Sequence, residues 1–387
     1  MNMIIETKTL VAINEVFKRL NNLRRWTEIT TSAKYDEISK QALNCFICFL
    51  LAKEVEEKGV NVCWENFPKI AIFRAFQKAY VNYDTPERIL KSISELGESN
   101  FSLQFKHVTA KIISRETSEE FAEWLKTAQG TYEEIIYKAA TKIATLLELK
   151  EIRANINGDY WLKYKEVVES MKKYEVVPSF TEMSNEEGEI FKVFKMVSKL
   201  RNQNRWAAYS YSVSCSVLGH LFDTAVFAYW MCIEKYNSEE IATKCFFMGI
   251  FHDIPEAFTK DIPSPIKDEI HGFRELTEEY ELWCMEKNFY PKLTTISMEL
   301  SNAVREIMFE DDINLEYKAL IKGADYMSAV SEIIRQFMGG SRDPEFLSAI
   351  QRHDKKFERG IAEHTCTTKE MYDRMCKYAK QLGIGGF

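Results

Sequence analysis

Apolar residues recur along most of this chain at the spacing of three to four residues that an α-helix requires. Two stretches, residues 41–52 and 221–232, are apolar on almost every side, which predicts helices buried in a core. Residues 117–125 begin with Thr117 followed by Glu120, the spacing of a capping box, ahead of an amphipathic run. We find no stretch with the strict alternation of a half-buried strand. The pattern therefore predicts an all-α protein.

The length and composition favour two helical domains. The chain has 387 residues, more than one domain usually holds, and its 15 glycines and 8 prolines are few for that length. A hydrophobic content of 46% with 28% charged residues is typical of a globular protein. Residues 173–188 are polar, contain Pro178 and break the helical pattern, which favours a linker. We therefore expect domains at residues 1–180 and 181–387.

Charge and cysteine content restrict the partners and the compartment. A net charge of -7 disfavours broad binding to nucleic acids or acidic membranes. No apolar run reaches the roughly 18 residues of a membrane span, and the N-terminus lacks a signal-peptide pattern. Nine cysteines, mostly in apolar segments, indicate reduced thiols, and Cys45 and Cys48 lack the second ligand pair of a zinc site. We expect a cytoplasmic protein with buried, unpaired cysteines.

The two halves of the chain resemble each other. Three segments align in the same order: residues 20–26 with 200–206, 83–93 with 260–270, and 138–141 with 322–325. The offsets of 180, 177 and 184 drift only slightly, and the last continues to the pair Asp159 and Asp343. Ordered matches of this kind predict an internal duplication.

The most informative stretch lies in the second half, where His252 and Asp253 end an apolar segment. His220 and Asp325 lie on two other apolar segments. Two imidazole nitrogens and two carboxylates suit one borderline divalent ion such as manganese, iron, cobalt or zinc. An ion of this kind supports hydrolysis, so we expect metal-assisted hydrolytic chemistry.

The first half lacks these groups. At the aligned positions, His220, His252, Asp253, Glu256 and Asp325 are replaced by Lys40, Ala75, Phe76, Ala79 and Thr141. Alanine and phenylalanine cannot bind a cation, and a lysine repels one. We expect the first half to be non-catalytic.

The second half resembles the HD-domain metal phosphohydrolases, whose signature is His…His-Asp…Asp, and within them the YfbR-type 5'-deoxyribonucleotidases. The resemblance spans about residues 190–355 and is most specific in the block His-Asp-x-x-Glu-x-x-x-x-Asp-x-Pro-x-Pro-x-Lys at residues 252–267. Asn204-Arg-Trp206, His220, and the segments 321–325 and 339–346 also carry it.

This resemblance implies tandem HD-domain-like helical bundles, the first degenerate, that pack as an intramolecular pseudo-dimer, and it leaves a further homo-oligomer open. It implies one divalent metal ion (Mn, Co, Fe, Zn or similar) held by His220, His252, Asp253 and Asp325. The family usually has a Ser-Glu-type lead-in before its first metal histidine, whereas residues 216–219 here read Ser-Val-Leu-Gly. We expect His220 to have lost a polar neighbour, which would loosen the ligand or change the substrate.

Two carboxylates are candidates for catalysis. Glu256 follows His252 by four residues, so in a continuous helix its side chain lies one turn away on the same face. That position suits general acid/base work on water or on the leaving oxygen. Asp261 resembles the second catalytic carboxylate of the family, and it also suits a turn residue that caps the following segment.

Four further residues are candidates for substrate binding. Arg205 presents a planar donor fork for a phosphate, and Trp206 can pack against the sugar where a ribose 2'-hydroxyl would lie. Both recur as Arg25-Trp26 in the first half, which equally favours a packing role. Thr259 and Lys267 offer a hydroxyl and a cation near the phosphate.

The favoured function is a metal-dependent phosphohydrolase, a 5'-nucleotidase that releases phosphate from (deoxy)nucleoside 5'-monophosphates. One alternative keeps the enzyme and changes the substrate to a dNTP or a cyclic nucleotide. Another is a nucleotide-sensing or scaffold protein that works through the degenerate first half.

Overall fold

The computed structural model describes residues 7–31, 33–80, 119, 130–152, 158–262, 264–309, 315–356 and 366–384. The capping box expected at residues 117–125 and the repeat segment 83–93 lie outside these residues, apart from residue 119.

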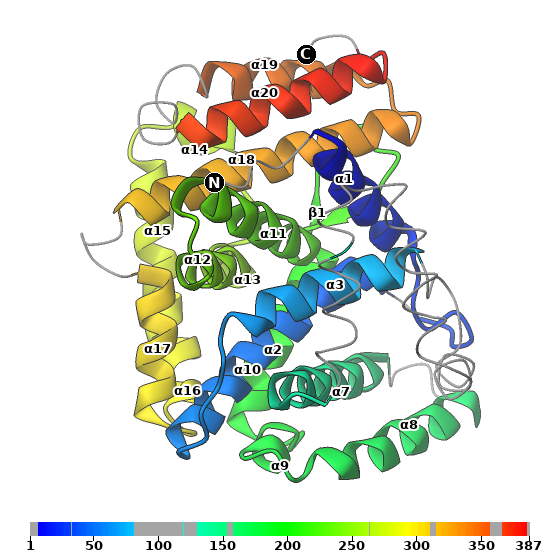
Figure 1. Ribbon diagram of the computed structural model, residues 1–387, viewed down its shortest axis with the longest axis vertical. Helices are drawn as coiled ribbons and strands as arrows, with labels where there is room; N and C mark the ends of the chain where they lie inside the picture. Colours follow the sequence, from blue (N-terminus) through cyan, green and yellow to red (C-terminus); the bar gives the residue numbers. More distant parts are fainter. Residues whose placement is uncertain are drawn as a thin grey trace.

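The prediction of an all-α protein is confirmed, with one small addition (Figure 1). Two strands of two residues, which the sequence pattern did not predict, pair antiparallel, with Arg205 opposite Cys215. The described elements of the first half and the connection are α1 Thr7–Asn22, α2 Glu37–Glu57, α3 Asn66–Tyr80, α7 Tyr132–Ile152, α8 Gly158–Met171, η2 Lys172–Tyr174 and α9 Phe180–Met183. Those that follow are α10 Glu189–Ser198, η3 Lys199–Asn202, β1 Asn204–Arg205, β2 Cys215–Ser216, α11 Val217–Tyr236, α12 Glu239–Phe251, α13 Glu256–Thr259, α14 Ser264–Glu269, α15 Phe273–Cys284, η4 Met285–Phe289, α16 Tyr290–Leu293, α17 Met298–Phe309, α18 Leu315–Met338, α19 Pro344–Lys356 and α20 Cys366–Gln381.

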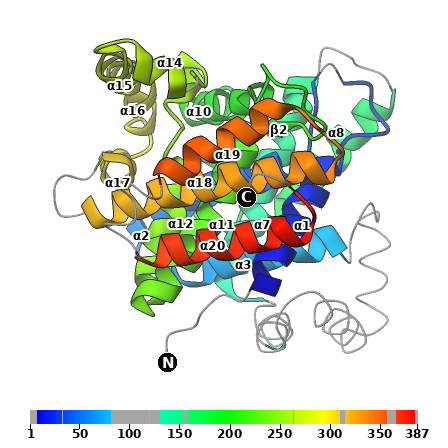
Figure 2. The same ribbon diagram turned by 90° about the horizontal axis from the view of Figure 1, so that it is seen from above.

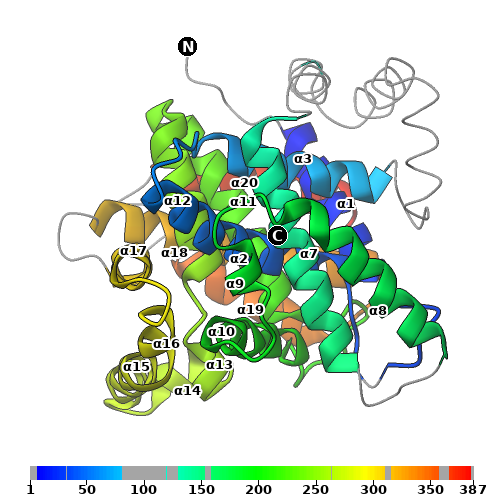
Figure 3. The ribbon, with the colours of Figure 1, turned by 90° about the horizontal axis from the view of Figure 1, so that it is seen from below.

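Helices α2 and α11 lie at the centre and are buried along nearly their whole length. Seen from above, α18 and α20 lie over α11, α18 also contacts α12, and α19 packs on α18 (Figure 2). Seen from below, α2 crosses the centre between α7 and α12 (Figure 3). Cys45 and Cys48 are buried on α2, and burial raises the pKa of both thiols, which agrees with the predicted packing role.

One hydrophobic core joins both halves of the chain. Phe46 of α2 contacts Phe194 of α10 and Phe251 of α12, with ring centroids 6.3 and 5.1 Å apart. Because these rings come from both sides of residue 180, the halves share apolar surface instead of burying it separately.

The connection between the halves is packed rather than extended. Residues 173–188 contain α9 and part of η2, unlike the polar linker that the sequence suggested. The reason is an apolar residue every third position, at Tyr174, Val177, Phe180 and Met183, and all four are buried in the shared core.

Local sequence signals set the ends of the helices that lead to the candidate site. The Ser216 hydroxyl accepts a hydrogen bond from the Gly219 amide and caps α11, while Asn237, in a left-handed conformation, ends that helix. Gly249 of α12 packs closely on α11, since a Cβ there would lie 2.6 Å from the Cα of Ala225. This close approach brings the end of α12 beside the start of α11.

Among the described helices, none combines the length and apolar character needed to cross a bilayer.

Candidate active site

Three predicted ligands, His220, His252 and Asp325, converge from three helices, with ligand atoms that all lie within 4.8 Å of one another. His220 is in the first turns of α11, and His252 directly follows the last residue of α12. Asp325 lies inside α18, which begins at Leu315. The convergence depends on packing between helices far apart in sequence.

Asp253 completes a four-residue cluster. His220 Nε2 lies 3.1 Å from Asp325 Oδ1 and 3.8 Å from Asp253 Oδ2, and His252 Nε2 lies 3.0 Å from the same Asp253 oxygen. Two ligand atoms that each bind one ion at about 2.1 Å are separated by about 3 to 4 Å. The four side chains therefore have the spacing that a single divalent ion requires.

The hydrogen bonds of the imidazoles leave the ligating nitrogens pointing into the cluster. The His252 Nδ1–H donates to the carbonyl oxygen of Gly249 at 2.8 Å, which leaves Nε2 as an acceptor. That Nε2 is buried and has no hydrogen-bond partner among the described residues. An orphaned buried acceptor beside a carboxylate is costly, and a cation between them satisfies both. The donor set therefore fits a metal ion.

The pKa values of the two aspartates and of His220 are shifted by their neighbours in the cluster. Burial raises the pKa of Asp253, but His252 outweighs burial, and the pKa lies below its usual range. Burial and Lys322 likewise act in opposite directions on Asp325, whose pKa is held well below its usual value. Burial lowers the pKa of His220, whereas its hydrogen bonds to Asp325 and Glu332 raise it to about 9. Both aspartates are therefore ionised and suited to a cation.

Glu256 occupies a different local structure from the one expected. The helix does not continue from His252, because α12 ends at Phe251 and Glu256 begins the short helix α13. Its carboxyl group is nevertheless buried, and Oε2 has no hydrogen-bond partner among the described residues. Burial, Asp253 and Asp261 raise the pKa of Glu256 well above its usual value. A carboxyl group whose pKa is raised in this way suits general acid catalysis.

Gln203 fixes the loop that carries these carboxylates, and sequence reasoning missed it. Its Nε2 donates to the carbonyl oxygen of Glu256, and its Oε1 accepts from the amide of Asp261, each at 3.1 Å. Lys260, between them, has a left-handed φ of 67°. Gln203 thereby holds Asp261 close to Glu256.

Thr259 is the last residue of α13, and Lys267 lies on α14. The Thr259 hydroxyl donates to Glu281 Oε1 of α15 at 2.7 Å, so it is already engaged by a protein partner. Lys267, on α14, lowers the pKa of both Glu256 and Glu281 through its charge, although burial raises them more. Their predicted contact with a phosphate stays a prediction.

Arg205 and Trp206 are held by one carboxylate. Arg205 Nε and Trp206 Nε1 donate to Glu332 Oε2 at 3.0 and 2.7 Å. Neither terminal nitrogen of Arg205 donates a hydrogen bond to any residue that the structure describes, so the outer fork is open. Burial lowers the pKa of Arg205, while Glu332 and then Asp261 raise it well above its usual value. The fork stays charged beside the acidic cluster.

Trp206 also has the packing role that its recurrence in the first half suggested. Its ring contacts Tyr209 and Phe346 at centroid distances of 5.5 and 5.6 Å. The ring is only partly buried, so one side remains for a substrate.

Three residues of α18 belong to the site and were missed. Lys322 Nζ lies 2.6 Å from Asp325 Oδ2, Ser328 Oγ lies 2.8 Å from His220 Nδ1, and Glu332 Oε1 lies 3.2 Å from the same nitrogen. They stand three residues before, three after and seven after Asp325, which is one face of a helix. That spacing was the available signal.

These contacts correct the expectation that His220 has lost its polar neighbour. A side chain at Gly219 would place a Cβ 2.8 Å from Ile38 Cγ2 of α2, so a glutamate does not fit there. Ser328 and Glu332 supply the polar neighbours from α18 instead.

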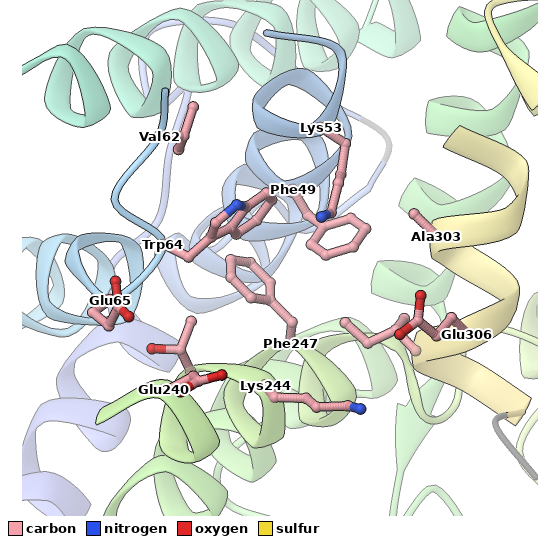
Figure 4. Close-up of a pocket in the computed structure, with 12 residues that line it drawn as sticks. Phe49, Lys53, Val62, Trp64, Glu65, Glu240, Lys244, Phe247, Ala303 and Glu306 are labelled. Atoms are coloured by element: carbon pink, nitrogen blue, oxygen red, sulfur yellow. The ribbon is translucent and has the colours of Figure 1, made fainter. Parts of the chain in front are cut away.

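A separate pocket of about 380 Å³ lies between the halves (Figure 4). Phe49 and Trp64 line it from the first half, and Phe247 and Glu306 from the second. Its residues on α12 precede the end of that helix, whereas His252 follows it, so the pocket and the metal cluster are different places.

The comparisons with known proteins agree with this geometry. Residues 192–371 match the family model described as 5'-deoxynucleotidase YfbR-like. A 5'-deoxynucleotidase of Yersinia pestis (strain Pestoides F) is 28% identical over 166 residues, which are 42% of this chain and 81% of that protein. A 5'-deoxynucleotidase of Yersinia pseudotuberculosis serotype O:3 (strain YPIII) matches with the same identity and coverage. Residues 192–371 are thus similar to the YfbR-like 5'-deoxynucleotidases, in agreement with the resemblance found in the sequence.

Proposed function

We propose that this protein is a metal-dependent 5'-nucleotidase that releases phosphate from deoxynucleoside 5'-monophosphates. The observation that carries the proposal is the four-ligand cluster with an open, charged Arg205 fork beside it. The names of the relatives, 5'-deoxynucleotidases, point to the same substrate class. A cytoplasmic location and a nucleotide as the partner are part of the proposal.

His220, His252, Asp253 and Asp325 would hold the ion. A divalent ion at this place polarises a phosphoryl oxygen and lowers the pKa of bound water towards about 7. Arg205 would bind two phosphate oxygens through its terminal nitrogens, in the bidentate geometry that guanidinium groups favour.

Glu256 would manage the proton. Its carboxyl group donates a proton to the 5'-oxygen as the bond from phosphorus to that oxygen breaks. It regains a proton from the water whose oxygen has attacked phosphorus, so the products are the nucleoside and phosphate. Asp261, held beside it by Gln203, supports the raised pKa that this role needs.

Trp206 would select the sugar. Its ring is fixed on one side by Tyr209 and Phe346 and at Nε1 by Glu332, so it cannot turn away to admit a larger sugar. A rigid aromatic face packs on a deoxyribose and leaves a 2'-hydroxyl without a hydrogen-bond partner.

The test is a substrate panel on protein loaded with Mn²⁺ or Co²⁺. Deoxynucleoside monophosphates, ribonucleoside monophosphates, dNTPs and cyclic nucleotides are compared by the product released. We expect phosphate from deoxynucleoside monophosphates above all, and none from Asp253→Ala. Phe76→Ala, at the aligned position of the first half, is the matched control. If metal-loaded protein releases phosphate from no nucleotide, the proposal is contradicted. If it releases tripolyphosphate from dNTPs, the enzyme acts on the alternative substrate, a dNTP.

We also propose that residues 1–180 are a degenerate copy of residues 181–387 and that the two pack as an intramolecular pseudo-dimer. Backbone features that recur at an offset of 180 support this. The bridge between Arg24 and Asp36 matches the pairing of Asn204 with Ser216. Trp26 and Trp206 have the same unusual left-handed φ, 60° and 62°.

A further inference from the structure

Glu332 touches both parts of the proposed site at once. It lies inside α18 and is fully buried. Its Oε1 lies 3.2 Å from Nδ1 of the metal-ligand candidate His220. Its Oε2 accepts from Nε of Arg205 and from Nε1 of Trp206. One rigid carboxylate therefore sits between the ion-binding residues and the phosphate-binding residues.

The charge of Glu332 is maintained despite burial. The Arg205 guanidinium lies 3.0 Å from its Oε2 and the His220 ring lies 3.2 Å from its Oε1, and both contacts favour the ionised form. An ionised carboxylate in a buried setting makes hydrogen bonds about twice as strong as those between neutral groups. The orientation of each partner is therefore strongly dictated by this group.

The first half contains an internal comparison. Glu148 Oε2 accepts from Arg25 Nε at 3.1 Å and from Trp26 Nε1 at 3.0 Å, the same atoms as in the second half. The residue at the position of His220 is Lys40, which lies 3.9 Å from Glu148. We call the arrangement in which one glutamate oxygen accepts from an arginine and a tryptophan a clamp. The first half has this clamp without a metal-ligand histidine. The contact of the glutamate with an imidazole is therefore specific to the second half.

We propose that Glu332 is a positioning residue that makes ion binding and phosphate binding depend on each other. The proposal rests on the proposed function for the identity of the phosphate ligand. With Nδ1–H donating to Glu332, the His220 ring presents Nε2 to the ion. The same carboxylate aims the Arg205 fork, so a displacement of Glu332 by either partner is transmitted to the other.

Glu332→Gln tests the role with little change of shape. The amide oxygen can still accept from Arg205 and Trp206, but the amide nitrogen then faces His220 Nδ1 and favours the tautomer that carries its proton on Nε2. We expect the affinity of the metal-free protein for Mn²⁺, measured by calorimetry without nucleotide, to fall roughly 10- to 100-fold. We also expect inorganic phosphate to bind Mn²⁺-loaded Glu332→Gln more weakly than the wild type. Thermal unfolding of the same samples reports the fold.

Glu148→Gln is the matched control, since it alters the same clamp in the half without metal ligands. It should lower thermal stability to a similar degree and leave the affinity for Mn²⁺ within twofold of the wild type. Equal losses of Mn²⁺ affinity in both variants would mean a purely structural role and overturn the proposal. So would a folded Glu332→Gln with wild-type affinity.

A second pair covers the case in which Glu332→Gln fails to fold. Trp206→Phe removes one hydrogen bond to Glu332 without touching His220, and Trp26→Phe does the same to Glu148. We expect Trp206→Phe, and not Trp26→Phe, to weaken Mn²⁺ binding roughly threefold. Unchanged binding in Trp206→Phe overturns the proposal. These readouts need no nucleotide, so they stand apart from a failure of the nucleotidase assay.

Discussion

The clamp of Arg25, Trp26 and Glu148 and the clamp of Arg205, Trp206 and Glu332 use the same atoms, but their surroundings differ. In the first half, Glu37 Oε2 also accepts from Arg25 NH1 at 2.9 Å and closes the arginine fork. The aligned residue in the second half is Val217, which cannot accept a hydrogen bond, and the Arg205 fork is open. A motif that holds a helix to a loop in one place is thus available for ligand binding in the other.

The side chain that lies beside the glutamate of each clamp differs as well. Lys40 carries its own ammonium group into the interior of the first half, where it donates to Thr145 and lies near Glu148. His220 instead is one of three clustered residues whose ligand atoms could hold an external ion. At the aligned position, the first half thus has a lysine near its buried glutamate where the second half has a histidine.

Replacement of the arginine of each clamp by lysine should give the largest difference in kcat/KM between the two clamps. Arg205→Lys removes the bidentate fork and one bond to Glu332, so we expect kcat/KM for a deoxynucleoside monophosphate to fall roughly 100-fold. Arg25→Lys should leave kcat/KM within twofold, because its fork is already occupied by Glu37. Steady-state kinetics on both variants measures this, and a comparable loss in Arg25→Lys would refute the assignment of the open fork.

The shared core predicts that the halves do not unfold separately. Because Phe46 packs on Phe194 and Phe251 across the boundary, unfolding of either half exposes apolar surface of the other. We expect a single calorimetric transition whose van't Hoff and calorimetric enthalpies agree. Two resolved transitions would show that residues 1–180 and 181–387 are independent domains.

Lys40, in the first half, should make the free energy of unfolding depend on pH. Burial, followed by Arg25, lowers the pKa of Lys40 from 10.5 to about 7 in the folded protein. Between pH 7 and 10.5 the unfolded chain binds a proton that the folded protein does not, so stability rises with pH across this window and the gain is lost as pH falls towards 7. Glu148 remains paired with Arg25 and Arg201 throughout.

Lys40→Met removes that titration. The difference in unfolding free energy, wild type minus variant, should therefore rise between pH 7 and 10.5, by up to roughly 1.4 kcal/mol per pH unit. Chemical denaturation at several pH values measures it. A difference that does not vary with pH would show that Lys40 keeps its proton in the folded state.

Much of the fold and part of the site were predictable from local patterns. Continuous apolar runs predicted α2 and α11, and the block that starts at His252 pointed to the ligands and to Glu256. Glu332, Ser328 and Gln203 were missed because their partners lie on other elements, and only packing pairs them. The packed connection at residues 173–188 was missed because its polar residues outnumber the apolar ones that face the core.

By itself, the sequence determined the helical class of this protein and the chemical types of the four candidate ligands, because these depend on residue types and on residues a few positions apart. The tertiary structure decided which side chains share one buried carboxylate, and it decided that the Arg205 fork is open while that of Arg25 is closed. Those outcomes depend on distances between helices more than 100 residues apart along the chain, which are set by how the apolar faces of α2, α11 and α18 pack.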